Sequence, residues 1–119
     1  LDDNGLQIDG KVEDVKALDC LYSKWESFGF NVIPCDGHNI EMLLDSLEKA
    51  RQTKGQPSII IARTVKGKGV PFMENKAEWH GKAPSDEEYE KAMKALKLEE
   101  EKIEHNISGL PGKEESICF

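Results

Sequence analysis

The sequence lacks the features of a membrane-spanning, secreted or nucleic-acid-binding protein. No apolar run approaches the roughly 20 residues that span a bilayer, and no basic-then-apolar leader opens the chain. Positive charge is in deficit, because 16 Lys and Arg face 23 Asp and Glu and leave a net charge of −7. This balance disfavours diffuse attraction to nucleic acid or to an anionic membrane. Any anion that the chain binds must be held by a local arrangement of groups.

Cysteine is also scarce. The three cysteines, Cys20, Cys35 and Cys118, are odd in number and include no Cys-x-x-Cys pair. This argues against a disulfide framework or a thiolate zinc site and favours a reducing, cytoplasmic location. We expect Cys20 and Cys35 to be packed thiols.

The length of 119 residues allows one domain at most. Its 33% charged and 38% hydrophobic residues fit a soluble globular chain. The chain begins with Leu1-Asp2-Asp3-Asn4, which is neither an initiator Met nor a leader and is typical of a strand end that meets a turn. We therefore expect the chain to be a piece of something longer.

Hydrophobic spacing predicts helices that alternate with strands. One amphipathic helix is expected to end at Gly29, and a short strand follows over residues 31–35, ended early by Pro34. Asn39 caps a second helix, and residues 58–62 form a continuous apolar run typical of a strand buried on both faces. The apolar stripes of the two helices are Val15, Leu18, Leu21, Tyr22, Trp25 and Phe28, then Ile40, Leu43, Leu44, Leu47 and Ala50. This order predicts an α/β fold, a parallel sheet sandwiched by helices.

The remainder of the chain divides into a loop, a helix and a tail. Residues 63–84 show no periodicity, and a loop of that length in a compact domain is usually functional or disordered. Ser85-Asp86-Glu87-Glu88 is a capping box that starts a third helix. We expect one domain over residues 1–98 and a charged helix end and tail over residues 99–119.

Two segments carry groups suited to chemistry, and both follow a predicted strand. They are Asp2-Asp3-Asn4-Gly5-Leu6-Gln7-Ile8-Asp9-Gly10 and the loop Lys66-Gly67-Lys68-Gly69 continuing to Trp79-His80-Gly81-Lys82-Ala83-Pro84. In parallel α/β sheets, ligands bind outside the carboxyl ends of the strands. The first segment resembles the end of the thiamine diphosphate motif of transketolases, and the second resembles their later active-site loop. Asp36-Gly37-His38 lies between the two, as in that family, and the similarity runs from Leu1 to about Leu98.

The resemblance implies a site for thiamine diphosphate, bridged to the protein by Mg²⁺ or Ca²⁺. Asn4 would supply its side-chain oxygen to the metal and Leu6 its backbone oxygen, a donor set suited to a hard cation. Ile8 would pack against the cofactor's rings. Taken without the resemblance, Asn4-Gly5 is an ordinary turn and Ile8 is ordinary core.

The loop contributes two further residues by the same resemblance. Lys66 matches a lysine near the cofactor diphosphate, and His80 matches the histidine that reaches both the diphosphate and the substrate's reacting end, a catalytic role. Lys82 could also face these anions. Alone, each would be a solvated loop residue. We expect His38 to play a structural role that leads into the next helix.

Parts of the family's site are absent from the chain. The Gly-Asp-Gly that opens the motif supplies a third metal ligand, and a glutamate from another domain activates the cofactor. The resemblance therefore implies the second half of a diphosphate-binding domain, similar to the N-terminal subunit of split transketolases. The implied partners are the remaining transketolase polypeptides, in a two-fold symmetric assembly, and sugar phosphates.

The function implied is transfer of a two-carbon ketol unit from a ketose phosphate to an aldose phosphate. A non-catalytic interaction module that keeps the fold remains an alternative. A related thiamine enzyme is another, with dihydroxyacetone synthase harder to exclude than deoxyxylulose phosphate synthase. A nucleotide-binding loop fits poorly, because Lys-Gly-Lys-Gly lacks the spacing of a P-loop.

Overall fold

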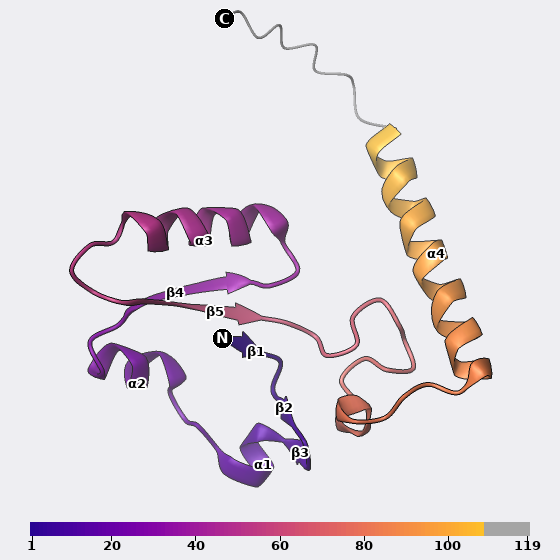
Figure 1. The fold of residues 1–119 in the computed structure, drawn as a ribbon, viewed down its shortest axis with the longest axis horizontal. Helices are drawn as coiled ribbons and strands as arrows, with labels where there is room; N and C mark the ends of the chain where they lie inside the picture. The colour runs from indigo at the N-terminus through magenta and orange to yellow at the C-terminus, as the bar shows by residue number, and fades with distance from the viewer. Residues whose placement is uncertain (109–119) are drawn as a thin grey trace, which may run out of the picture. The chain divides into compact units, whose positions relative to one another are not determined.

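The computed structural model describes residues 1–108. The chain divides into two compact units, Leu1–Ala83 and Pro84–Phe119. The first unit is built on a three-stranded parallel sheet, with the strand order β1 (Asp2–Asp3), β5 (Ser58–Arg63), β4 (Asn31–Asp36). All three strands point the same way, so their carboxyl ends meet at one edge (Figure 1).

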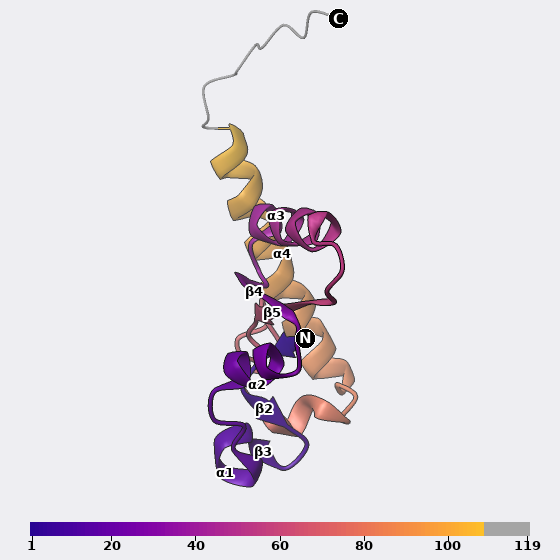
Figure 2. The same cartoon turned by 90° about the vertical axis from the view of Figure 1, so that its left-hand side faces the viewer.

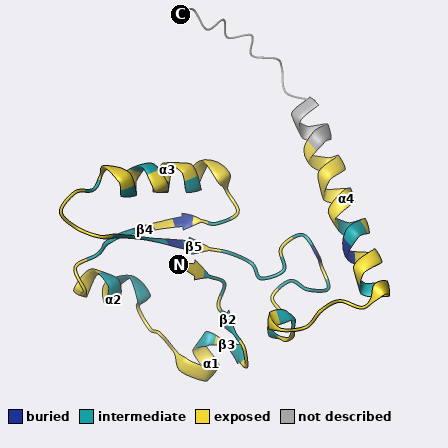
Figure 3. Ribbon diagram, viewed as in Figure 1, coloured by how far each residue is buried: buried dark blue, intermediate teal, exposed yellow. Residues whose placement is uncertain are grey.

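The core of the sheet lies on its middle strand. Ile61 of β5 is completely buried, and Ile33 and Cys35 of β4 are buried beside it (Figure 3). The continuous apolar run correctly predicts the central strand, although Ile59 and Ile60 are only half-buried. Cys35 is the packed thiol that the sequence predicts.

The expectation that Pro34 ends its strand early is wrong. β4 continues to Asp36, and Pro34 lies opposite Ile61 in the register. Among the described strands, β4 has β5 as its single neighbour. A strand paired on one side can accommodate the missing N–H of proline.

Helices cover both faces of the sheet. α3 (Ile40–Gln52) packs on β4 and β5, and α2 (Leu21–Ser27) contacts β4 from the opposite side. Figures 1 and 2 both show the sheet between these two helices. The predicted α/β sandwich is therefore confirmed.

The single amphipathic helix expected before Gly29 is two short helices instead. α1 (Val12–Lys16) and α2 are separated by an irregular segment in which Asp19 has a φ of +48°. A left-handed residue cannot continue a right-handed helix. The stripe is covered only in part: Leu21, Tyr22 and Trp25 are half-buried, whereas Val15 and Leu18 are exposed and Phe28 is 77% exposed. Gly29 does end α2 as predicted, with a φ of +81° and its N–H donated to the Glu26 carbonyl.

α3 begins as predicted but does not bury its predicted stripe. The Asn39 side-chain oxygen accepts a hydrogen bond from the Met42 N–H at 3.1 Å. The buried position of the helix is Ser46, whose hydroxyl donates to the Met42 carbonyl. Ile40, Leu44 and Leu47 are each more than half exposed. Of the predicted stripe, Leu43 and Ala50 are half-buried, so the helix covers part of the stripe and leaves its other large apolar side chains uncovered.

Two small elements follow β1 and β5. An antiparallel hairpin joins β2 (Leu6–Gln7) to β3 (Gly10–Lys11). The long loop after β5 contains one turn of 3₁₀ helix, η1 (Ala77–His80). The rest of the loop is turns, in keeping with its lack of hydrophobic periodicity.

The second unit is described by the helix α4 (Asp86–Ser108). Its predicted capping box is confirmed: the Ser85 N–H donates to Glu88 Oε2 at 2.8 Å, and the Glu88 N–H donates to Ser85 Oγ at 3.3 Å. The predicted tail beyond Ser108, with Cys118, lies outside the described residues. Within residues 1–108, no helix is both long and apolar enough to cross a bilayer.

Candidate functional site

The three segments singled out by the sequence leave the same edge of the sheet. In the strand register, Asp3 at the end of β1 and Asp36 at the end of β4 both lie opposite Arg63 at the end of β5. Backbone hydrogen bonds continue beyond the strands: the Gly37 N–H donates to the Arg63 carbonyl at 2.7 Å, and the Thr64 N–H donates to the Asp3 carbonyl at 3.3 Å. The Thr64 hydroxyl also donates to the Asp2 side chain. The residues that follow β1, β4 and β5 therefore start from one place, as the rule for parallel sheets predicts.

The first of these segments is a tight turn at Asn4. Asn4 Oδ1 accepts a hydrogen bond from the Leu6 N–H at 2.9 Å, and Gly5 has a φ of +70°. The Gly5 carbonyl is occupied by the Val12 N–H at 2.9 Å. These bonds lock the turn and the start of the hairpin into one conformation.

The oxygen donors of this turn fit a hard cation. An amide oxygen has two lone pairs, so Asn4 Oδ1 retains acceptor capacity after its bond with Leu6. An amide oxygen and a backbone carbonyl are ligands that Mg²⁺ and Ca²⁺ accept. Among the described residues, no group of three or more His, Cys, Asp or Glu side chains could hold a metal. A metal here would take further oxygen ligands from the cofactor, from water or from other polypeptide.

The remaining predicted residue of the first segment lies on the hairpin. Ile8, between β2 and β3, is 67% exposed. It is therefore not the ordinary core residue that a purely structural interpretation predicts. An exposed apolar side chain at this place is available to a ligand or to another polypeptide.

Lys66 lies just beyond β5, on a loop that folds back on itself. Its carbonyl accepts a hydrogen bond from the Asn75 N–H at 3.0 Å. The next residue, Gly67, has a φ of +73°, and a Cβ there would lie 2.8 Å from the Met73 backbone. Glycine is therefore required both by conformation and by space. The Lys66 side chain is half-buried on this closed loop.

His80 ends the 3₁₀ turn, which is braced by an aromatic cluster. The Trp79 ring meets the Phe72 ring edge-on, with centroids 5.5 Å apart, and the Lys82 ammonium lies 4.1 Å from the centre of the Trp79 ring. Both contacts are favourable in these geometries. His80 itself is exposed. The contacts of Trp79 thus stabilise the turn from which the exposed His80 side chain projects.

The hairpin and the 3₁₀ turn lie against each other. Both β2 and β3 contact η1, so the structure brings the segment of Asn4, Leu6 and Ile8 together with the turn of His80. Lys66 belongs to a separate stretch, at the exit of β5. Two buried donors on the contacting elements, Gln7 Nε2 and Trp79 Nε1, have no hydrogen-bond partner among the described residues. Such donors usually have an acceptor, which here would come from a further group.

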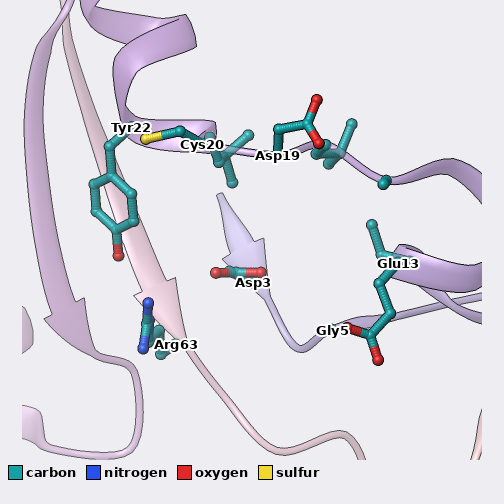
Figure 4. Close-up of a pocket in the computed structure, with 11 residues that line it drawn as sticks. Asp3, Gly5, Glu13, Asp19, Cys20, Tyr22 and Arg63 are labelled. Carbon is teal, nitrogen blue, oxygen red and sulfur yellow. The ribbon is translucent and has the colours of Figure 1, made fainter.

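A hollow of about 560 Å³ lies beside the same sheet edge, although none of the five predicted site residues lines it (Figure 4). Asp3 and Arg63 approach it from the ends of β1 and β5, Tyr22 from α2 and Cys20 from the position just before α2. Cys20 is exposed, so its prediction as a packed thiol is wrong. A hydrogen bond with the Ser23 hydroxyl lowers the pKa of the Cys20 thiol.

The sequence interpretation missed the roles of two aromatic rings. The His38 ring does more than lead into α3, since its Nε2 accepts a hydrogen bond from the Val65 N–H at 2.7 Å. Trp79 braces the turn that carries His80. The position of Trp79 beside His80 is a signal in the sequence, whereas His38 and Val65 are 27 positions apart and nothing in the sequence indicates their contact.

Comparison with known proteins supplies the family. The model of the family described as "Transketolase, thiamine diphosphate binding domain" matches residues 1–108. An apulose-4-phosphate transketolase subunit from Actinobacillus succinogenes is 43% identical over 98 residues, which cover 82% of this chain and 35% of the relative. The subunit of the same name from Phocaeicola vulgatus is 35% identical over 92% of this chain and 39% of its own length.

A third relative is named for a different substrate. The 6-deoxy-6-sulfo-D-fructose transketolase subunit SqwG of a Clostridium species is 37% identical over 82% of this chain and 36% of its own length. The chain thus spans little more than a third of these curated relatives. The match to the family model covers nearly the whole chain. The matched residues include the α/β fold and the sheet edge described above. The chain belongs to the transketolase family, through its thiamine diphosphate binding domain.

Proposed function

We propose that this chain is part of a transketolase that transfers a two-carbon ketol unit from a ketose phosphate to an aldose phosphate. The observation that carries the proposal is the contact between the β2–β3 hairpin, which begins at the Asn4 turn, and the 3₁₀ turn that ends in His80. Family membership alone would suggest the activity. The meeting of these two segments supplies a site where it could occur.

In this proposal, residues of the hairpin and the loop hold the cofactor and its metal. Asn4 and Leu6 would bind Mg²⁺ or Ca²⁺ through oxygen, and Ile8 would pack against the rings of thiamine diphosphate. Lys66 would contact the diphosphate. The diphosphate-binding portion is assigned to residues 1–98, with residues 99–119 as a charged helix end and tail.

His80 is the proposed catalytic residue. Thiamine diphosphate, when bound, supplies the stabilisation of carbanion charge that ketol transfer requires. The imidazole of His80 would hydrogen-bond to the diphosphate and to the reacting end of the substrate. Its exposure at the end of η1 leaves the ring accessible for both contacts.

The proposed activity needs other polypeptides. The three curated relatives described above are each named as one subunit of a transketolase. The unpaired donors of Gln7 and Trp79, which lack a partner within residues 1–108, also favour a site completed by further groups. We propose a cytoplasmic, two-fold symmetric assembly in which other transketolase polypeptides supply the remaining metal ligand and the activating glutamate.

A non-catalytic interaction module is the second candidate. The uncovered apolar side chains of Ile40, Leu44 and Leu47 on α3 favour it, because such a stripe suits a protein interface. A related thiamine enzyme such as dihydroxyacetone synthase would use the same groups and differ in its substrates.

The deciding experiment is an assay of the chain combined with the polypeptides that complete it. Ketose phosphates carrying ¹³C at C1 and C2 are supplied with thiamine diphosphate, Mg²⁺ and, in parallel reactions, either an aldose phosphate or formaldehyde as acceptor, and products are read by mass spectrometry. Transfer of both labelled carbons to the aldose phosphate supports the proposal. Transfer to formaldehyde alone indicates dihydroxyacetone synthase, and no transfer by an intact assembly favours the interaction module.

A further inference from the structure

The exit of β5 is held by a contact that the proposed chemistry does not use. The Val65 N–H donates to His38 Nε2 at 2.7 Å, across 27 residues of sequence. Val65 immediately precedes Lys66, so its orientation sets the direction in which the chain presents the lysine. A backbone N–H can only donate, so His38 Nε2 is the acceptor in this contact.

The backbone of His38, which carries the ring, is held in place by two hydrogen bonds of the strand exit. Its backbone N–H donates to Asp36 Oδ1 at 2.9 Å, forming a turn typical of Asp. The neighbouring Gly37 N–H donates to the Arg63 carbonyl at 2.7 Å. A Cβ at Gly37 would lie 2.5 Å from Thr64 Cγ2, so the two strand exits are in close contact.

The segment on the other side of Lys66 is also tied down. The Val65 carbonyl accepts from the Lys68 N–H at 3.1 Å, and the Lys66 carbonyl accepts from the Asn75 N–H at 3.0 Å. Among the described residues, His38 is the side chain that bonds to the backbone on the β5 side of Lys66. Thr64 would still be bonded to Asp2 and Asp3, so loss of the His38 bond would loosen the chain at Val65 itself while the other bonds remain.

We infer that His38 is a positioning residue that aims Lys66 at the anionic group of the ligand through the Val65 N–H. This inference rests on the proposed role of Lys66 at the diphosphate. It replaces the expectation that His38 serves only to introduce α3. His38 touches neither cofactor nor substrate in this role and acts through the backbone.

Two amide substitutions distinguish this role from a general structural one. The side-chain oxygen of glutamine can reach the place of Nε2, whereas that of asparagine lies nearer the place of Nδ1. In the holoenzyme assembled with the completing polypeptides, His38→Asn and His38→Ala should weaken thiamine diphosphate affinity about 2- to 10-fold, the range for loss of one neutral hydrogen bond. His38→Gln should restore affinity to within about 2-fold of the parent.

Hydrogen exchange of the apo assembly supplies a readout besides cofactor binding. The peptide that contains Val65 should exchange faster in His38→Asn than in the parent and should regain protection in His38→Gln. Equal exchange in all three proteins would overturn the inference. Equal losses of cofactor affinity in His38→Asn and His38→Gln would also overturn it, because they would show a requirement for the ring itself.

A double-mutant cycle with Lys66→Ala separates this inference from the proposed function. If His38 acts through Lys66, His38→Ala should cause no further loss of cofactor affinity once Lys66 is alanine. Additive losses would overturn the inference and leave the role of Lys66 intact. If Lys66→Ala alone left the affinity unchanged, the proposed role of Lys66 would be wrong, and the inference would fall with it even where His38→Asn still loosened Val65.

Discussion

The side-chain oxygen of Asn4 accepts a hydrogen bond from the backbone N–H of Leu6, at 2.9 Å. The two residues proposed to bind the metal are thus already joined to each other by the turn. This bond fixes where the Asn4 oxygen lies before any ligand arrives, and such preorganisation reduces the cost of binding.

Replacing Asn4 with alanine should weaken metal and cofactor binding. The change removes both the proposed metal ligand and the acceptor for the Leu6 N–H. In the completed assembly, the apparent affinity for thiamine diphosphate should fall about tenfold or more and recover in part at high Mg²⁺ and cofactor concentrations. Calorimetric titration at several Mg²⁺ concentrations measures this.

Asn39→Ala is the matched control for Asn4→Ala. The Asn39 oxygen also accepts one backbone N–H, from Met42, but at the start of α3. Its loss should lower the free energy of unfolding by about 0.5–2 kcal/mol and leave cofactor affinity unchanged. Equal losses of affinity in the two variants would show that Asn4 acts only through stability.

Replacing His80 with alanine should impair turnover more than cofactor binding. If His80 hydrogen-bonds to charge that grows on the substrate, its loss acts on the transition state. By analogy with loss of one oxyanion donor, kcat should fall roughly 10²- to 10³-fold, or about 2.7–4 kcal/mol. Steady-state kinetics at saturating cofactor test this. If saturating cofactor fully restored the turnover of His80→Ala, His80 would have an anchoring role at the diphosphate instead.

Gly67→Ala should destabilise the loop that carries Lys66. Gly67 and Gly55 have nearly the same φ, +73° and +74°, but a Cβ meets the Met73 backbone at Gly67 and open space at Gly55. Both substitutions incur left-handed strain of about 1–2 kcal/mol, and Gly67→Ala adds a clash. Thermal unfolding should show a larger loss of stability in Gly67→Ala than in Gly55→Ala. Cofactor titration should show a loss of affinity in Gly67→Ala and none in Gly55→Ala. Equal stability and equal cofactor affinity in the two variants would contradict the close packing of Gly67 against Met73.

Cys20 should react with iodoacetamide well before Cys35. Cys20 is exposed and its hydrogen bond with Ser23 lowers the pKa of the thiol, whereas Cys35 is buried. A lowered pKa means that the reactive thiolate appears at lower pH, so the rate for Cys20 should rise with a midpoint below that of an ordinary thiol. Ser23→Ala should move the midpoint to higher pH. Peptide mapping resolves the sites, and equal rates for Cys20 and Cys35 would contradict the prediction.

Local signals in the sequence predicted the local features of the fold. Asn39 and the Ser85–Glu88 capping box mark helix starts because each side chain bonds to a backbone group three residues away. Gly29 marks a helix end through a left-handed conformation that glycine adopts freely. These signals depend on neighbours in sequence, so they could be interpreted without knowledge of the fold.

Features that depend on tertiary neighbours could not be predicted from such local signals. Helical spacing continued through Asp19, where the backbone turns left-handed and divides the expected helix in two. Pro34 is tolerated because β4 has one neighbouring strand among those described. The buried face of α3 contains Ser46 rather than Leu44 or Leu47. Periodicity identifies an apolar stripe, but it does not identify what covers that stripe.

The candidate site divides in the same way. Its residues were identified by resemblance, because the types Asn, Lys and His in turns carry little information by themselves. The structure was needed to show that the hairpin lies against the turn of His80 and that Lys66 lies on a separate stretch. The bond from Val65 to His38 depends on the register of β4 and β5, which no local pattern specifies.

The central claim is that this chain contributes part of a thiamine diphosphate site that other polypeptides complete. Calorimetric titration of thiamine diphosphate with Mg²⁺, into the isolated chain and into the completed assembly, tests it most directly. Because each missing charged partner is worth about 1.5–3 kcal/mol, the assembly should bind the cofactor at least about 100-fold more tightly than the chain alone. Equal affinities for the two, or no binding by an intact assembly, would contradict the claim.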